Sequence, residues 1–191
     1  MNYKMMGKFI SQILFVEAAF MLPALLISVL ERNIPGIWGF ALSIVITAAV
    51  ASVLYVLCRH AVRRFYAREG LVCVGMSWIF MSLLGCLPFF MSGEIPNFLD
   101  ALFEIVSGFT TTGASILSNV EGLSKGMLYW RSFSHWLGGM GVLVFLLAVG
   151  ERGDKGSGFT LHLLRAESPG PTVGKLVPKM RTTARILYMM Y

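Results

Sequence analysis

Residues 107–115 read SGFTTTGAS, a stretch with three consecutive threonines that follows a short apolar run. The rest of the chain is strongly apolar, since 56% of its 191 residues are hydrophobic and 14% are charged. A soluble domain carries roughly 25% charged residues. The fold therefore depends on how a threonine loop is held between segments that suit a lipid bilayer.

Four apolar runs are long enough to cross a bilayer core of roughly 30 Å, which takes about 20 helical residues. They cover residues 9–30, 37–57, 71–91 and about 128–149. We predict an all-α integral membrane protein, with Pro88 bending the end of its third span or weakening the last turn. Its parts are two leading spans (1–58), a basic cytoplasmic loop (59–70), a repeat of span, half-helix, loop and span (71–149), and a cytoplasmic connector with the start of another helix (150–191).

Basic residues gather on one side of this arrangement. All but three of the 16 lysines and arginines lie before the first span, after the second or after the fourth. The positive-inside rule places these clusters, and the N-terminus with them, in the cytoplasm. The net charge therefore reports membrane topology, and we expect membrane lipid rather than nucleic acid as a partner. The opposite side is mildly acidic, which suits the capture of cations.

Residues 97–109 predict a short helix, with Asn97 as its N-cap and Asp100 three residues later. About 12 residues reach roughly 18 Å at 1.5 Å per residue, which is deep enough to enter a membrane and too short to cross it. The chain must then return to the side from which it came, so the segment is re-entrant. The threonine loop lies at its inner tip, where irregular backbone is tolerated only inside protein or beside water.

The composition of the loop suits a partly dehydrated monovalent cation, which rings of backbone carbonyls coordinate in place of water. The β-branched Thr110, Thr111 and Thr112 favour extended backbone, and Gly113 permits dihedral angles that are closed to other residues. The carbonyl end of the half-helix adds partial negative charge. A plain Thr/Gly turn without an ion is the alternative, and the predicted topology argues against it.

Three motifs in this order, SGFTTTGAS, WRSFSHWLGGMGVLVF and LLRAESPGP, resemble the first pore-loop repeat of the Trk/Ktr/HKT potassium transporters, TrkH/TrkG branch. The resemblance covers essentially the whole chain and implies a pore of four such repeats. By position, Thr111 and Thr112 would supply carbonyls to K⁺, with Thr110 and Gly113 completing this quarter of the filter. The resemblance also implies K⁺ uptake across a bacterial cytoplasmic membrane, a homodimer of the full-length transporter and a cytosolic TrkA-like nucleotide-binding regulatory subunit.

Further residues are assigned supporting roles. Glu104 on the half-helix is predicted to support the pore, or else to be a simple buried hydrogen-bond acceptor, and Ser115 is assigned to pore support with it. The small residues Gly138, Gly139 and Gly141 are predicted to allow close helix packing.

Residues near the outer end of the last span are assigned to the membrane interface. Tyr129, Trp130 and Trp136 predict an aromatic belt, and Arg131 is expected to extend to the lipid headgroups. His135 is interpreted as a hydrogen-bonded interface histidine. Cys58, Cys73 and Cys86 have no metal-ligand spacing and are predicted to be small buried hydrophobic residues.

A single loop cannot form a ring, and TARILYMMY, residues 183–191, resembles the first turns of another span. We therefore expect the N-terminal portion of a longer transporter. The alternatives are a subunit that forms a ring from four copies, and a non-conducting membrane scaffold or remnant, which would leave the threonine loop unexplained. We predict no enzymatic activity and no cofactor, because clusters of His, Asp, Glu or Cys on facing spans are missing. Channel-like transport and coupling to H⁺ or Na⁺ stay open.

Overall fold

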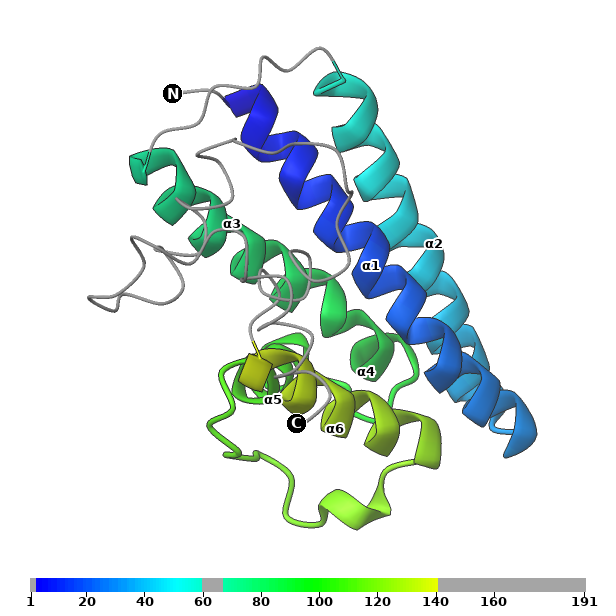
Figure 1. Cartoon of the computed structure of the whole chain (residues 1–191). Helices are drawn as coiled ribbons and strands as arrows, with labels where there is room; N and C mark the ends of the chain where they lie inside the picture. The colour runs from blue at the N-terminus through cyan, green and yellow to red at the C-terminus, as the bar shows by residue number, and fades with distance from the viewer. Residues whose placement is uncertain (1–2, 60–66, 141–191) are drawn as a thin grey trace.

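The computed structural model describes residues 3–59 and 67–140, and within them every regular element is a helix. Helices α1 (Tyr3–Leu30) and α2 (Ile34–Leu57) are joined by a short turn and run antiparallel, side by side (Figure 1). They are followed by α3 (Ala67–Gly85), α4 (Leu87–Met91), α5 (Phe98–Phe109), the 3₁₀-helix η1 (Val120–Gly122) and α6 (Lys125–Met140).

Among the described residues, three segments are long and apolar enough to cross a membrane: Tyr3–Leu30, Ile34–Leu57 and Val72–Met91. They coincide with the first three predicted spans, although α3 begins earlier than predicted, within the basic loop. The fourth predicted span begins in α6, and its remainder lies outside the described residues, as do residues 60–66 of the loop and the connector. The predicted fold class is confirmed.

The third span is interrupted where Pro88 predicts a bend. Helix α3 ends at Gly85 and α4 begins at Leu87, because a proline has no N–H to donate to the preceding turn of the helix. The indole Nε1–H of Trp130, on α6, donates to the Gly85 carbonyl oxygen over 2.9 Å. A side chain from α6 is therefore bound to the backbone at the break.

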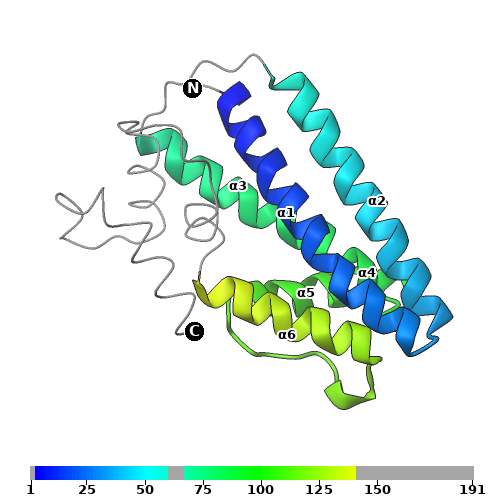
Figure 2. The same ribbon diagram turned by 45° about the vertical axis from the view of Figure 1, so that its right-hand side comes forward.

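Helix α5 begins as predicted, since the Asn97 side chain accepts a hydrogen bond from the Leu99 N–H at 3.0 Å. Nearby, the Glu94 carboxylate accepts from Asn33 Nδ2 at 3.3 Å and from the Ser124 N–H at 3.0 Å. The α1–α2 turn, the approach to α5 and the start of α6 thus meet at one end of the bundle (Figure 2). The chain therefore approaches α5 and begins α6 at the same end of the bundle, which is the geometry that the re-entrant prediction requires.

The core is centred on α1, which packs against α2, α3 and α6. Its side chains Ile13, Leu14 and Met21 are fully buried. Close approach depends on glycine: a Cβ atom on Gly126 of α6 would lie 3.0 Å from the Ala24 carbonyl oxygen of α1. Large apolar side chains cover the outward faces of α1, α2 and α3, as expected of helices that contact lipid.

Candidate functional site

The threonine loop begins with a helix cap. The Thr111 N–H donates to the Gly108 carbonyl at 3.0 Å, and the Thr112 N–H donates to the Ser107 carbonyl at 3.0 Å. This pair of hydrogen bonds is the Schellman motif, which ends a helix with one residue in the left-handed conformation. Thr111 occupies that position with a φ of 56°. The motif thus fixes the direction in which the chain leaves α5.

The backbone of the loop differs from the extended conformation that the threonines predict. Thr110 has a φ of −85° and a ψ of 0°, and Thr111 is left-handed, so the prediction is wrong for these two residues. Hydrogen bonding at the helix end outweighs the intrinsic preference of the side chains. A β-branched residue at positive φ is unusual and costs about 1–3 kcal/mol. Gly113 has a φ of 75°, which agrees with the prediction that glycine is needed there.

The three threonine hydroxyls form hydrogen bonds within the loop and to the last turn of α5. Thr110 Oγ1 donates to the Val106 carbonyl at 2.8 Å and lies 2.8 Å from Thr112 Oγ1, while Thr111 Oγ1 donates to the Thr110 carbonyl at 2.7 Å. Within the described part of the chain, no hydrogen bond engages the carbonyls of Thr111, Thr112 or Gly113. These residues are exposed. The loop therefore presents carbonyl oxygens that are available to an external ligand.

Two side chains of α5 hold the far end of the loop. Ser107 Oγ donates to the Ala114 carbonyl at 2.6 Å. Glu104 accepts a hydrogen bond from Ser115 Oγ, 3.0 Å from each carboxylate oxygen, and another from the Ile116 N–H at 3.2 Å. Glu104 and Ser115, predicted to act together, are thus brought into direct contact. Both ends of the loop are fastened to the same half-helix.

Glu104 also bonds to α6. Its carboxylate is fully buried and pairs with the Arg131 Nε–H, whose side chain is 16% exposed. The expectation that Arg131 extends to the headgroups is wrong, because a buried carboxylate at this position requires a compensating charge. The pair connects the loop, through Glu104, to the helix that follows it.

Glycine places α6 against the end of α5. A Cβ atom on Gly138 would lie 2.1 Å from the Phe109 carbonyl oxygen, and one on Gly108 would lie 2.1 Å from Ser134 Oγ. Gly138 thus lies against the last residue of the half-helix, as its predicted packing role requires. Gly139 is exposed, and Gly141 lies outside the described residues.

The aromatic belt is only partly compatible with the structure. Trp130 is fully buried and bonded to the α3–α4 break, so its assignment to the interface is wrong. Tyr129 and Trp136 are half-buried and pack on Phe133, with ring centroids 5.7 Å and 5.3 Å from it. His135 is hydrogen-bonded as predicted, through Nδ1, to the Arg131 carbonyl at 2.9 Å. The cysteines carry free thiols, with Cys73 and Cys86 buried and Cys58 half-buried.

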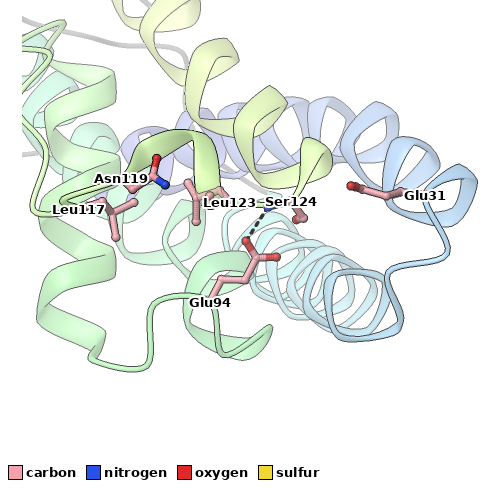
Figure 3. A pocket seen from close by; sticks show the side chains of 7 residues that line it. Glu31, Glu94, Leu117, Asn119, Leu123 and Ser124 are labelled. Carbon is pink, nitrogen blue, oxygen red and sulfur yellow. Dashed lines mark hydrogen bonds between the residues drawn. The ribbon is translucent and has the colours of Figure 1, made fainter.

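An open pocket lies at the opposite end of α6 from Gly138 (Figure 3). It is lined by Glu31, Glu94, Leu117, Asn119, Gly122, Leu123 and Ser124. Its acidic residues accept hydrogen bonds from backbone N–H groups at the start of α6: Glu31 from Lys125 at 3.0 Å, and Glu94 from Ser124. Carboxylates favour the N-terminal end of a helix because of its partial positive charge. This pocket lies at the N-terminal end of α6, and its carboxylates join the turns that meet there.

Comparison with known proteins gives consistent matches. Residues 38–191 match the family model described as TrkH, cation transport protein. TrkH of Halomonas elongata is 32% identical over 194 residues, which is 100% of this chain and 39% of that protein. TrkG of Escherichia coli is 32% identical over 177 residues, covering 90% of this chain and 35% of that protein.

Among solved structures, the potassium transporter TrkH from Vibrio parahaemolyticus matches with a TM-score of 0.76 and 27% identity, covering 100% of this chain and 37% of that one. The chain thus spans about two fifths of the length of the curated relatives that it matches. The matched structure and the three apolar helices agree with a multi-pass membrane protein.

Proposed function

The chain belongs to the TrkH family of cation transport proteins, and we propose that it contributes one filter loop, residues 110–113, to a pore for potassium uptake. One observation carries the proposal: among the described residues, the carbonyls of Thr111, Thr112 and Gly113 accept no hydrogen bond, and they lie directly after the C-terminal end of the short helix α5. The names of its relatives support potassium as the ion.

In the proposed mechanism, the loop exchanges hydration oxygens for carbonyl oxygens and performs no covalent chemistry. A neutral carbonyl binds K⁺ strongly enough for entry and weakly enough for release. The C-terminal end of α5 points toward the loop and adds partial negative charge. The Schellman cap, Ser107 and Glu104 hold the carbonyls in place without occupying them.

The pore is completed by further loops. Beside the loop, the outward face of α5 exposes Leu99, Phe103 and Val106, which are 69%, 48% and 38% exposed. These residues share one face of the helix, so the loop and an apolar stripe form one continuous uncovered surface. We propose that further span–loop–span repeats cover it and bring their own loops to the same axis.

Replacing Gly113 by valine is expected to reduce potassium flux about tenfold or more, because a β-branched residue at this positive φ costs about 1–2 kcal/mol and each 1.4 kcal/mol is tenfold. Open space surrounds the position, so the effect comes from the backbone. The measurement is potassium-limited growth and K⁺ flux of the protein expressed from its own gene, in a host without other potassium uptake.

The matched control is Gly93→Val. Gly93 has a φ of 77° and equally open surroundings, and it lies in the turn between α4 and α5. Both variants should lose similar thermal stability, while only the loop variant loses flux. Equal flux in Gly113→Val and the parent protein would contradict a filter role for this loop.

We further propose that the N-terminus faces the cytoplasm of a bacterial inner membrane. Lys4, at the start of α1, and Arg59, after α2, lie at the end of the bundle opposite to Glu31 and Glu94. The positive-inside rule places the end that carries the basic residues in the cytoplasm.

A membrane-impermeant thiol reagent should label Glu121→Cys on intact cells and Lys4→Cys only after permeabilisation. Both positions are exposed. The parent protein gives the background from its own thiols, and the reverse labelling pattern would invert the orientation.

A further inference from the structure

A carboxylic acid occupies the middle of the first helix. Glu17 lies near the midpoint of α1, its side chain is fully buried, and neither carboxyl oxygen has a hydrogen-bond partner among the described residues. Helix α1 is one of the segments suited to crossing a membrane. The potassium pore proposed above makes no use of this group.

Glu17 contacts the break in the third span. A Cβ atom on Gly85 would lie 2.8 Å from Glu17 Oε1, 3.2 Å from the Phe109 ring and 3.3 Å from the Ile105 side chain. Trp130 donates to the Gly85 carbonyl at the same place. The carboxyl therefore lies where α1, α3, α5 and α6 converge, and much of that surrounding is apolar.

A second unpartnered polar atom lies at a similar depth. Thr47, on α2, is fully buried and its Oγ1 has no hydrogen-bond partner in the described part of the chain. Glu17 and Thr47 are separated from the turn between α1 and α2 by the same number of residues. In an antiparallel hairpin they therefore lie at the same height along the helix axes. The interior of the bundle thus holds two polar side chains, Glu17 and Thr47, that form no hydrogen bond with any of the described residues.

We propose that Glu17 is a proton-binding site within the membrane. An ionised carboxylate at this depth would need a cation or several hydrogen-bond donors, and the described structure provides neither. The neutral acid needs no counter-charge. The carboxyl group keeps its proton while α1 packs against the α3–α4 break. When water enters the space between α1 and this break, the proton passes to water and leaves a carboxylate.

The neighbouring titratable groups leave this assignment unchanged. Cys86, at the break, is close enough to interact electrostatically with Glu17. Helix α2 carries no charged residue. On α5 and α6, Glu104 and Arg131 are paired with each other, while Tyr129 and His135 of α6 are partly exposed. A separate cation for Glu17 is therefore absent from the described charged side chains that pack around it.

Proton release is expected to influence the filter loop, and this step rests on the proposed pore. Gly85 is in contact with both Glu17 and Phe109, the residue from which the loop departs. A hydrated carboxylate needs more room than the packed acid, so release would displace the break and with it the end of α5. Linkage is reciprocal, so the position of the loop would also alter the affinity of Glu17 for its proton.

Infrared spectroscopy of the purified protein in lipid nanodiscs tests the site directly. At neutral pH the parent protein should show the C=O stretching band of a protonated carboxylic acid, and Glu17→Gln should lack it. The exposed Glu121→Gln, as the matched control, should instead lose carboxylate intensity. Identical acid bands in the parent protein and Glu17→Gln would overturn the proposal, as would a Glu17 carboxylate band that shifts when K⁺ replaces a large organic cation.

Flux as a function of pH tests the coupling. Potassium flux of the parent protein should vary with pH, and Glu17→Gln, which mimics the protonated acid, should lose that dependence. The same pH profile in both proteins would overturn the coupling. A parent protein without flux at any pH would contradict the pore and not the proton site, because the infrared band requires no transport.

Discussion

Gly138→Ala is expected to lower potassium flux and thermal stability together. The added Cβ would lie 2.1 Å from the carbonyl oxygen of Phe109 and 2.7 Å from its carbonyl carbon. Both are backbone atoms, so no rotamer change relieves the overlap, and α6 must move away from the end of α5. Overpacking of this kind costs about 1–3 kcal/mol. The displacement acts on Phe109, from which the threonine loop departs, so with the proposed pore we expect potassium flux to fall about tenfold or more.

The measurement compares Gly138→Ala with Gly75→Ala, by K⁺ flux in proteoliposomes and by thermal unfolding in the same detergent. Gly75 is also a glycine within a membrane helix, but a Cβ atom there meets nothing within 4 Å. This control should keep full flux and gain up to about 1 kcal/mol of helix stability. Parent-like flux and stability in Gly138→Ala would show that α6 does not set the position of the loop.

The half-helix was predictable because its determinants are local. Asn97 provides the N-cap, and the apolar run that follows has the length of α5. A run of this length is too short to cross a membrane. Pro88 likewise marks the break in the third span through its own missing N–H. Features of this kind are determined by residues that are neighbours in the chain, so the amino-acid sequence is sufficient to predict them.

The loop conformation was not predictable from side-chain preference. Threonine favours extended backbone, but Thr111 completes the cap of α5 and takes a φ of 56° for that reason. A helix that ends inside a protein must satisfy its last carbonyls. The helix end therefore decided the geometry of the loop, and the residue type did not.

The partners of Arg131 and Trp130 depend on tertiary structure. A position near the end of a span suggests an interface, yet both side chains turn inward, to Glu104 and to the Gly85 carbonyl. A usable signal existed for Arg131, because a carboxylate at membrane depth needs a cation and few basic residues lie on that side of the chain. The same argument, applied to the middle of the first apolar run, would have singled out Glu17.

Glu104→Leu is expected to cost about 3–5 kcal/mol of stability, because it leaves Arg131 as an uncompensated, largely buried charge. The substitution also removes the acceptor for Ser115 Oγ and the Ile116 N–H. Flux should therefore fall to a few per cent of the parent value or less, since a free-energy change of this size exceeds a hundredfold. Asp100→Asn, on the first turn of the same helix, is the control and should cost at most about 1 kcal/mol.

The double variant Glu104→Leu/Arg131→Leu separates the two roles of the carboxylate. Replacing both members of a buried ion pair by apolar residues is often neutral or stabilising, so thermal stability should recover. Flux should stay low, because Ser115 and Ile116 still lack the acceptor that holds the end of the loop. Recovery of flux together with stability would mean that the pair serves packing alone. Recovery of stability without flux identifies the carboxylate as the group that positions the loop, with Arg131 as the charge that makes its burial tolerable.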